Sequence, residues 1–330
     1  MCDPVASGLV PHIKLASGRS IPSIGMGTFG SDRYGPEEVS AAVAGAIRCG
    51  YRLFDCASVY GNEDLIGRVF EEAFESGAVK REELFITSKV WNDMHGPGKV
   101  LASIEKTLSD LRLSSVDAYF VHWPFPNYHA PGCDGDARNP DSVPFSAERF
   151  LATWKQMEEI YREGLARHLG MSNMTVSKLE AVLPLCNIKP ELIEMEQHPG
   201  FQQRELFDYC SKKGIAVIGY CPIGSPNRPD RDKAPGDVVD TELPEVIAVA
   251  KAHKIHPALV CVKWAVQRSS IPIPFSVHEK NYQGNLLAVT EDPLTQDEME
   301  LLKKAERNCR LVKGQVFLWP GAKGWEDLWD

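Results

Sequence analysis

The sequence predicts an α/β protein of the (β/α)8 barrel class, with an N-terminal β-hairpin before the barrel. Short apolar runs rich in β-branched and aromatic residues alternate eight times with longer segments of helical periodicity. No linker interrupts this alternation, and 330 residues suit one barrel of ordinary size. We therefore expect one domain over residues 1–330.

Each element follows from the local pattern. The hairpin is expected at 12–15 and 19–21, on either side of Gly18. The strands are expected at 24–28, 52–55, 84–89, 118–122, 168–172, 192–196, 216–220 and 271–276. The helices are expected at 36–49, 64–76, 99–111, 147–163, 176–183, 204–213, 244–253 and 258–268. Pro36 is expected to open its helix, and capping positions are expected at Asn62, Asn92, Ser146 and Thr241.

Three segments fall outside the repeat. Residues 125–144 and 224–240 are polar loops after the fourth and seventh strands, and residues 306–330 form an aromatic tail. All three are expected near the C-terminal ends of the strands, where barrel enzymes place their active sites. We expect the tail to close a substrate pocket there.

Composition excludes several classes of function. The net charge of −9 and the pI near 5.6 disfavour a nucleic-acid partner. Residues 1–8 have no basic stretch followed by an apolar core, and no apolar run is long enough to cross a membrane. The nine cysteines show no metal-ligand spacing, so we expect reduced thiols, no metal and a cytoplasmic protein, as a monomer or weak homodimer.

Four ionisable residues lie at the ends of three successive predicted strands: Asp55, Tyr60, Lys89 and His122. A tyrosine phenol has a pKa of about 10 and is a poor proton donor unless a neighbour stabilises the phenolate. A lysine ammonium lowers that pKa, and a carboxylate keeps the lysine charged and oriented. A histidine can orient a carbonyl oxygen. This set suits proton donation during carbonyl reduction.

Two other motifs suggest different dehydrogenase folds. Residues 25–30 match GxGxxG, with Asp55 as a candidate ribose ligand of a Rossmann domain. However, the spacing to Asp55 is long, and the next helix starts only at Pro36, too far from the glycines to hold a pyrophosphate. Tyr209 and Lys213 form a YxxxK pair, for which a solvated lysine beside a half-buried tyrosine is the simpler interpretation.

The chain resembles the aldo-keto reductase superfamily over nearly its whole length. The resemblance is carried by the segments 50–67, 86–91, 117–124, 167–173 and 219–225, with Met174 in place of the usual aromatic residue. It implies a barrel that binds an extended nicotinamide cofactor without a Rossmann domain. It also implies Tyr60 as general acid, Lys89 and Asp55 as its tuning pair, and His122 as the residue that orients the carbonyl.

The resemblance further implies the binding residues. Ser172 and Asn173 would hold the carboxamide, Tyr220 would stack on the nicotinamide, and the segment after the eighth strand would hold the adenosine phosphate. The expected cofactor-binding residues are Gly27, Thr28, Phe29, Asp55, Ser172, Asn173, Glu194, Tyr220, Cys221, Pro222, Ile223, Gly224, Ser225, Phe275, Ser276, Val277, Asn281 and Asn285. The expected substrate-binding residues are Phe29, Val59, Trp91, His122, Trp123 and Phe125.

Two departures from the family pattern concern the cofactor. Glu194 stands where a glutamine beside the nicotinamide amide is usual, and an ionised carboxylate there would favour the oxidised ring. Phe275 and Asn281 replace a lysine and an arginine expected near the 2′-phosphate of NADPH. Lys280 and His278 are out-of-register substitutes. NADPH is the family norm, but these losses make NADH use a serious possibility.

The sequence thus predicts NAD(P)H-dependent reduction of an aldehyde, with an aldose or sugar-like aldehyde as the favoured substrate. A reductase of ketones, steroids or quinones is an alternative. A cofactor-binding regulatory barrel without significant turnover is a second alternative, which the complete catalytic set disfavours.

Overall fold

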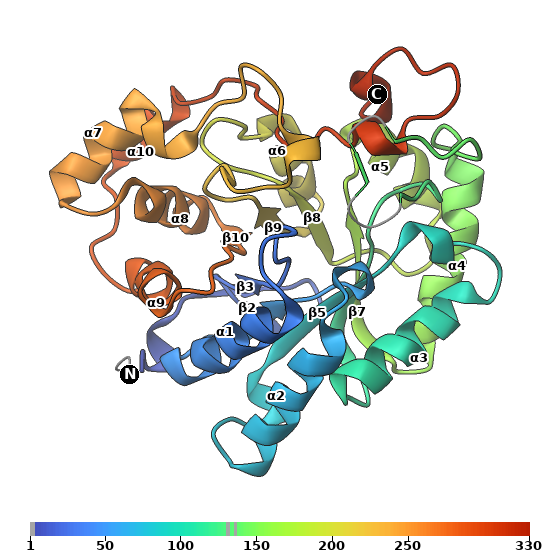
Figure 1. Ribbon diagram of the computed structural model, residues 1–330, viewed down its shortest axis with the longest axis horizontal. Coiled ribbons are helices and arrows are strands. Elements are labelled where there is room, and N and C mark those ends of the chain that lie inside the picture. Colours follow the sequence, from blue (N-terminus) through green and yellow to red (C-terminus); the bar gives the residue numbers. More distant parts are fainter. Residues whose placement is uncertain (1–3, 130–132, 135–136) are drawn as a thin grey trace.

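Eight parallel strands, arranged in chain order, form the centre of the molecule (Figure 1). The computed structural model describes residues 4–129, 133–134 and 137–330, so parts of the expected loop 125–144 lie outside the described residues. The strands are β3 (Met26–Gly27), β4 (Leu53–Asp55), β5 (Phe85–Val90), β6 (Val116–Val121), β7 (Ala166–Ser172), β8 (Leu192–Glu196), β9 (Ala216–Tyr220) and β10 (Ser270–Pro272).

The first and last strands also meet. The backbone N–H groups of Gly25 and Gly27 donate to the carbonyls of Pro272 and Pro274, at 3.0 and 3.3 Å. These two bonds join the β3 and β10 edges, and the predicted (β/α)8 fold is confirmed. β10 is shorter than expected because Pro272 and Pro274 have no N–H to extend the ladder.

Ten α-helices surround the strands in the described chain. They are α1 (Pro36–Cys49), α2 (Glu63–Glu75), α3 (Lys99–Leu111), α4 (Ala147–Arg162), α5 (Val176–Val182), α6 (Arg204–Lys212), α7 (Pro244–His253), α8 (Pro257–Gln267), α9 (Glu279–Ala288) and α10 (Gln296–Lys303). Two were not predicted. α9 has no clear apolar stripe, whereas α10 opens with the capping box Thr295–Glu298, a signal that sequence reasoning missed.

The predicted caps agree only in part. The Ser146 side chain accepts from the Arg149 N–H as expected, and Pro36 opens α1. Asn62 occupies the cap position of α2, but its side-chain amide donates to the Thr28 carbonyl instead. Asn92 begins a 3-10 helix (Asn92–Met94), and Thr241 lies inside another (Asp240–Glu242). Both predictions failed because short 3-10 turns precede α3 and α7.

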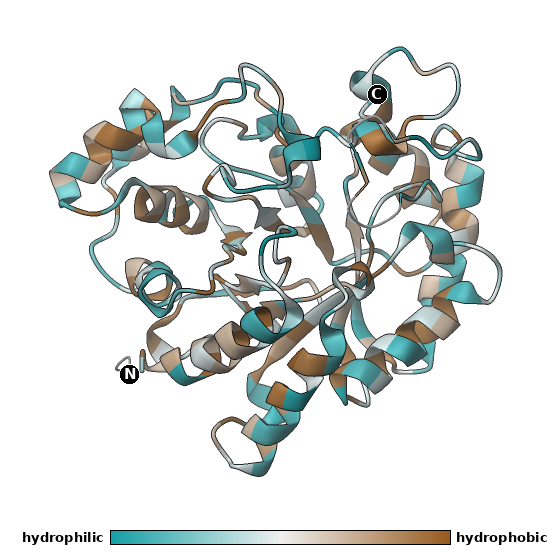
Figure 2. Cartoon of the chain, in the orientation of Figure 1, coloured by the Kyte–Doolittle hydropathy of each residue, from teal (hydrophilic) through white to brown (hydrophobic). Residues whose placement is uncertain are grey.

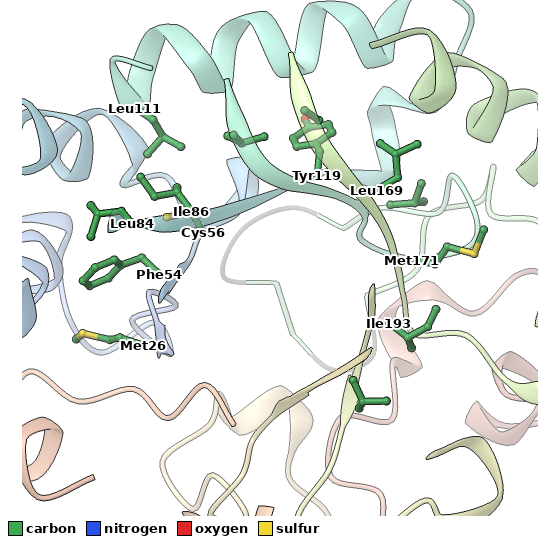
Figure 3. Packing of buried hydrophobic residues seen from close by; sticks show 14 of the residues in the cluster. Met26, Phe54, Cys56, Leu84, Ile86, Leu111, Tyr119, Leu169, Met171 and Ile193 are labelled. Carbon is green, nitrogen blue, oxygen red and sulfur yellow. The ribbon is translucent and has the colours of Figure 1, made fainter. Parts of the chain in front are cut away.

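The helices pack on the barrel through apolar faces, while hydrophilic residues cover their outer faces (Figure 2). Outward-facing strand residues such as Phe54, Ile86, Met171 and Ile193 meet the helices in one large buried cluster (Figure 3). Because side chains alternate along a strand, the residues between them face the barrel interior.

The barrel interior changes character from one end to the other. At the N-terminal end of the strands, the interior holds an apolar cluster whose strand members include Leu53, Phe85, Phe120, Leu192 and Ile218. Two positions further along, alternation brings polar residues to the same inner face. The fold therefore gathers polar residues at the C-terminal end of the strands, above an apolar floor.

The hairpin of β1 (His12–Lys14) and β2 (Ser20–Pro22) closes the other end of the barrel. Ile21 belongs to the inner apolar cluster, and Arg19 in the turn pairs with buried Asp117 at 2.9 Å. Asp117 also pairs with Arg81 at 2.8 Å and Arg167 at 3.2 Å. With one end sealed, access to the interior is from the C-terminal end of the strands.

Two further sequence expectations bear on the setting of the chain. None of the helices in the described part of the chain is both long and apolar enough to cross a membrane. Seven of the described cysteines are free thiols, in line with the expectation of reduced thiols.

Candidate active site

A cavity of about 450 Å³ lies at the C-terminal ends of the strands. Its walls come from the ends of the strands, from the loops that follow β3, β9 and β10, and from the C-terminal tail. It extends from Tyr60 and His122 at one end to Ser276 and Asn281 at the other. It is therefore an elongated pocket beside the predicted catalytic residues.

The centre of the site is a buried ion pair between Lys89 and Asp55. The Lys89 ammonium donates to both Asp55 carboxylate oxygens, at 2.7 and 2.6 Å, and to the Cys56 carbonyl at 3.0 Å. The Thr87 hydroxyl donates to Asp55 at 2.6 Å. These contacts fix Lys89 in place.

Lys89 remains charged in this setting. Burial alone would lower the pKa of its ammonium, but Asp55 and Glu194 outweigh burial and raise the pKa above its usual range. Lys89 itself lies beneath the cavity wall and is fully buried. Its charge acts on the cavity through Tyr60, whose ring centroid lies 5.4 Å from the ammonium.

Tyr60 is held at the cavity wall by a short 3-10 helix (Ser58–Tyr60). The Ser58 hydroxyl donates to the Lys89 carbonyl at 3.1 Å, which ties this helix to β5. Gly61 ends it with a positive φ of 65°, a conformation that glycine adopts without strain. The sequence at 58–61 therefore sets the direction of the phenol.

The acidity of Tyr60 differs from the sequence-based expectation. Burial raises the pKa of its phenol, Lys89 lowers it, and the balance is a pKa above the usual range. The expected lowering by lysine is present, but burial outweighs it in the free site. Tyr60 therefore keeps its proton at neutral pH and is ready to act as an acid.

His122 lies beside Tyr60 and Trp91, with ring centroids 5.9 and 5.0 Å away. Burial and, next, the Lys89 charge lower the pKa of its imidazole well below the usual value. The ring is neutral at pH 7, so it has one N–H donor and one acceptor nitrogen. It can hydrogen-bond a carbonyl oxygen without adding a second buried positive charge.

Glu194 on β8 is a third ionisable group in this cluster. Its side chain is buried and lines the cavity, 3.4 Å from the Lys89 ammonium. One of its carboxylate oxygens, Oε2, has no hydrogen-bond partner in the described chain. Burial and then Asp55 raise the pKa of Glu194 to about 8, against the opposing effect of Lys89. Burial therefore favours the neutral form of Glu194, whereas the interpretation of the sequence assumed an ionised carboxylate.

Most predicted binding residues meet at the cavity wall. Those that line it are Gly27, Thr28, Phe29, Asp55, Val59, Trp91, Trp123, Ser172, Asn173, Glu194, Tyr220, Cys221, Pro222, Ile223, Ser225, Phe275, Ser276, Val277 and Asn281. Three predicted residues are placed elsewhere. Gly224 packs against the Asp240 side chain, and Asn285 lies in α9, away from the cavity. The Phe125 ring packs against Trp123 and does not line the cavity.

The cavity suits an extended dinucleotide. Near the catalytic end, the Tyr220 hydroxyl donates to Asn173 at 2.7 Å, and the Asn173 amide donates to the His122 carbonyl at 2.9 Å. These hydrogen bonds fix the Tyr220 ring and the Asn173 amide near Glu194 at the cavity wall. The Oε2 atom of Glu194 has no hydrogen-bond partner in the described chain. A planar ring that carries an amide fits such a combination. At the far end, the N-terminus of α9 follows Ser276 and favours an anion.

Few positively charged side chains at the far end of the cavity are available to bind a phosphate. The Asn281 amide and the His278 N–H donate to the Ser276 hydroxyl, at 3.2 and 3.1 Å. His278 lines the cavity, whereas Lys280, the other suggested substitute, is not part of the wall. Arg228 and Arg231 also line the cavity, but each is already paired. Their partners are Asp237 and Asp32, respectively.

Sequence reasoning missed several residues of the wall. Arg228 and Arg231 belong to the polar loop 224–240, of which only Gly224 and Ser225 were named as expected binding residues. His129 packs between Trp91 and Phe317, with ring centroids 5.8 and 5.2 Å away. The aromatic tail was the signal for Phe317, which lines the cavity together with Val312, Gly314 and Val316. His129 gave no local signal, because it stands in an irregular loop.

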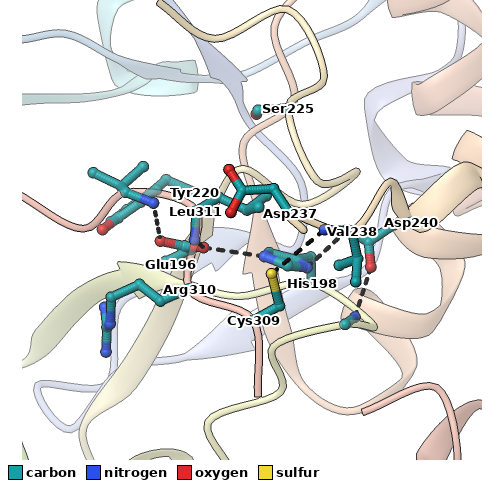
Figure 4. A network of polar contacts seen from close by, with 12 residues as sticks. Glu196, His198, Tyr220, Ser225, Asp237, Val238, Asp240, Cys309, Arg310 and Leu311 are labelled. Atoms are coloured by element: carbon teal, nitrogen blue, oxygen red, sulfur yellow. Dashed lines mark hydrogen bonds and ion pairs between the residues drawn. The ribbon is translucent and has the colours of Figure 1, made fainter. Parts of the chain in front are cut away.

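A second polar cluster fastens this tail to the barrel (Figure 4). Glu196 on β8 accepts from the backbone N–H groups of Leu311 and Val312, at 2.6 and 2.9 Å. His198 lies between Glu196, at 3.1 Å, and Asp240, at 2.7 Å. The two carboxylates outweigh the effect of burial and raise the pKa of His198 to about 9. A charged imidazole therefore links the tail to the loop before α7.

The two competing motifs do not form sites. Asp55 is committed to Lys89, and Met26 and Gly27 form the first barrel strand, so the Rossmann interpretation fails. Lys213 lies 5.7 Å from the Tyr209 ring on α6, and neither residue lines the cavity. No cluster of three or more potential metal ligands occurs among the residues that the structure describes.

Comparisons with known proteins agree with this geometry. A sequence model of the aldo/keto reductase family matches residues 23–307. An aldo/keto reductase of Synechocystis sp. is 36% identical over 320 residues, 97% of this chain and 96% of that protein. Aldo-keto reductase family 1 member A1 of Mus musculus is 37% identical over 302 residues, 91% of this chain and 90% of that protein. The crystal structure of a Bombyx mori aldo-keto reductase in complex with NADP has a TM-score of 0.80 at 29% identity, covering 92% of this chain and 95% of that one.

Proposed function

The chain belongs to the aldo/keto reductase family, and from that premise we propose that it reduces an aldehyde to the alcohol with Tyr60 as the proton donor. It is an NAD(P)-dependent oxidoreductase. The observation that carries the proposal is the buried Lys89–Asp55 pair beneath a protonated Tyr60 at the wall of an elongated cavity.

The bound nicotinamide supplies a hydride to the carbonyl carbon, and the protein supplies the proton. As negative charge develops on the carbonyl oxygen, Tyr60 gives up its phenolic proton to that oxygen. The phenolate that remains is stabilised by the Lys89 ammonium, which Asp55 holds in place. Neutral His122 donates to the same oxygen and orients the carbonyl toward Tyr60. Trp91 and the tail exclude water from this point.

The wall beyond His122 bears on the substrate. It is mainly aromatic and aliphatic, and its members include Trp91, Trp123, His129, Val312 and Phe317. Aromatic faces accept the C–H face of a sugar as well as a flat apolar group, and His129 adds one polar ring. We retain an aldose or sugar-like aldehyde as the first class to test. Aryl and alkyl aldehydes are the second class, favoured by the apolar majority of the wall.

The far end of the cavity bears on the choice of cofactor. We propose that NADH serves at least as well as NADPH, since Phe275 and Asn281 supply no positive charge for a 2′-phosphate. In the described chain, the two arginines of the cavity wall are already paired with carboxylates. A charge-assisted hydrogen bond contributes about 1.5–3 kcal/mol, so one restored cation changes affinity at least about tenfold.

This cofactor proposal is tested by the substitution Asn281→Arg. The dissociation constants of NADPH and NADH are measured by quenching of tryptophan fluorescence in the wild type and the variant. We expect at least about tenfold tighter NADPH binding in the variant with little change for NADH. A parallel change for both cofactors would contradict the proposal, because only NADPH carries the 2′-phosphate.

The activity itself is tested with a panel of aldoses, aryl aldehydes, alkyl aldehydes and ketones, each with NADPH and with NADH. Tyr60→Phe should bind cofactor normally and reduce aldehydes about 10²–10⁴-fold more slowly, since it lacks only the acidic proton. Turnover of ketones, steroids or quinones above aldehydes would favour the alternative substrate class. Cofactor binding with no turnover of any carbonyl would favour a regulatory barrel.

We further propose a monomer or weak homodimer that works in the cytoplasm. The seven free cysteines of the described chain support a reducing compartment. Sedimentation at several protein concentrations tests the first proposal. Thiol counting on protein isolated under alkylating conditions tests the second.

A further inference from the structure

Glu194 is a buried acid that the proposed reduction does not use. It stands on β8 with its side chain 4% exposed, facing the same end of the barrel as Asp55 and Lys89. The three Lys89 protons are already donated to Asp55 and to the Cys56 carbonyl. The 3.4 Å contact between Lys89 and Glu194 is longer than each of these three hydrogen bonds, so Asp55 receives the stronger share of the ammonium.

The distribution of donors decides which acid is neutral. Asp55 receives two hydrogen bonds from Lys89 and one from the Thr87 hydroxyl, all of which favour its ionised form. The Oε2 atom of Glu194 has the longer contact with Lys89 and no hydrogen bond from the described chain. With one ammonium between two buried carboxyl groups, the group with the weaker contacts takes the proton. The raised pKa of Glu194, to about 8, agrees with this geometry.

A proton on Glu194 changes what the cavity wall presents. A neutral carboxyl group has an O–H donor and a carbonyl acceptor, as a side-chain amide has an N–H donor and a carbonyl acceptor. An ionised Glu194 only accepts, and it leaves the cluster with Asp55 and Lys89 at a net charge of −1. Tyr60 and Tyr220 are the other titratable groups whose charges interact with Glu194 in the described chain, and both are neutral at pH 7.

The redox state of the cofactor determines which form of Glu194 is stabilised. Hydride transfer places the nicotinamide next to a carbonyl held by Tyr60 and His122, and so at the end of the cavity that Glu194 lines. The oxidised ring is a cation, whereas the reduced ring is neutral. A cation beside a buried acid favours loss of the acid's proton, and a neutral ring does not.

We propose that Glu194 is a proton-linked sensor of the cofactor's redox state, neutral in the free enzyme and with reduced cofactor, and ionised when oxidised cofactor is bound. The proton passes from the Glu194 carboxyl group to solvent, so binding of NAD⁺ or NADP⁺ releases about one proton. This inference rests on the proposed function, because it requires a nicotinamide cofactor in the cavity. It makes Glu194 a residue that sets the balance between oxidised and reduced cofactor.

Proton release on binding tests the inference without any turnover. Binding of NAD⁺, NADP⁺, NADH and NADPH is followed by calorimetry at pH 7, in two buffers with different enthalpies of ionisation. We expect about one proton released with the oxidised cofactors and about none with the reduced ones. In Glu194→Gln, which keeps the shape but cannot ionise, we expect none with either.

The pH dependence of affinity is the second readout. Below pH 8, oxidised cofactor must bind at the expense of removing the Glu194 proton. Its wild-type affinity should therefore rise with pH by up to about tenfold per unit between about pH 6 and 8, and then level off. Reduced cofactor should show no such rise. Glu191→Gln, which changes an acid that directly precedes β8, contacts His168 and does not line the cavity, should keep the wild-type behaviour.

The outcomes separate the two proposals. If the wild type binds neither oxidised nor reduced cofactor, the proposed function itself is wrong. If both bind but no proton is released with the oxidised form, the inference about Glu194 is wrong and the function stands. The inference is equally wrong if Glu194→Gln releases the same proton as the wild type.

Discussion

Glu194 and Glu196 are two buried acids on the same face of the same strand, yet their pKa values are shifted in opposite directions. Glu194 lies at the cavity, and its Oε2 atom lacks a hydrogen-bond donor in the described chain. Glu196 accepts from two backbone N–H groups of the tail and contacts charged His198. Burial would raise the pKa of both, but at Glu196 the contacts with His198 outweigh burial and lower it.

The difference shows that burial alone does not set the charge of an acid in this barrel. The number of donors that the fold directs at each carboxyl group decides it. Glu196 accepts hydrogen bonds from the backbone of the tail, so its negative charge has a structural role in holding the tail at the cavity. Glu194 keeps an unused oxygen at the cavity wall, which leaves its charge open to whatever binds there.

The largest expected effect comes from removing the cation shared by Asp55 and Glu194. Lys89→Met leaves two carboxyl groups without an ammonium, so the free energy of unfolding should fall by about 3–5 kcal/mol. Aldehyde reduction should fall at least about a hundredfold. Urea denaturation and steady-state kinetics measure the two effects. Lys263→Met is the control, since Lys263 donates to two backbone carbonyls away from the cavity and its loss should leave kcat near the wild-type value.

The next effect is the contrast between the two acids themselves. Glu196→Gln weakens charge-assisted bonds to the tail and to His198, and should cost about 2–3 kcal/mol of unfolding free energy. Glu194→Gln should cost less than about 1 kcal/mol or stabilise the protein, because it removes a poorly paired buried acid. Equal losses for the two variants would show that the donors around Glu196 do not matter as argued.

A smaller effect per pH unit is expected in the pH dependence of stability at Glu194. Its folded pKa of about 8 exceeds the unfolded value of about 4.3, so the folded state holds a proton that the unfolded state has lost. Wild-type stability should fall with rising pH in this window by up to about 1.4 kcal/mol per unit, and Glu194→Gln should lack this contribution. The stability of the variant relative to the wild type should therefore rise between about pH 5 and 8. Above pH 8 the difference in unfolding free energy should stay constant. A pH-independent difference would mean that Glu194 is ionised in the folded protein.

The last effect concerns His198, the cation of the second cluster. Its folded pKa of about 9 exceeds the unfolded value of about 6.5, so its contribution is complete below about pH 6.5 and is lost as pH rises through 9. His198→Gln should therefore destabilise the protein by up to about 3 kcal/mol more at pH 6 than at pH 10. Thermal unfolding at the two pH values measures this difference. A larger loss of stability at pH 10 than at pH 6 would show that His198 is not a cation in the folded protein.

The sequence allowed much of the fold and of the catalytic group to be predicted. Strand-end positions identified Asp55, Lys89 and His122, because parallel strands bring their C-terminal ends to one rim. The helix α9 was missed because its residues show no apolar period, and the caps at Asn92 and Thr241 were wrong because 3-10 turns intervene. His129 was missed because its place depends on loop packing rather than on a repeating pattern.

The sequence by itself determined the alternation of strands and helices, the polar residues at the strand ends and the departures at Glu194, Phe275 and Asn281. These depend on local periodicity and residue type, which the chain carries at every position. Only the tertiary structure decided the charges. The protonation of Tyr60 and Glu194 depends on how many donors, charges and buried surfaces meet there from distant parts of the chain, and no local pattern encodes that sum.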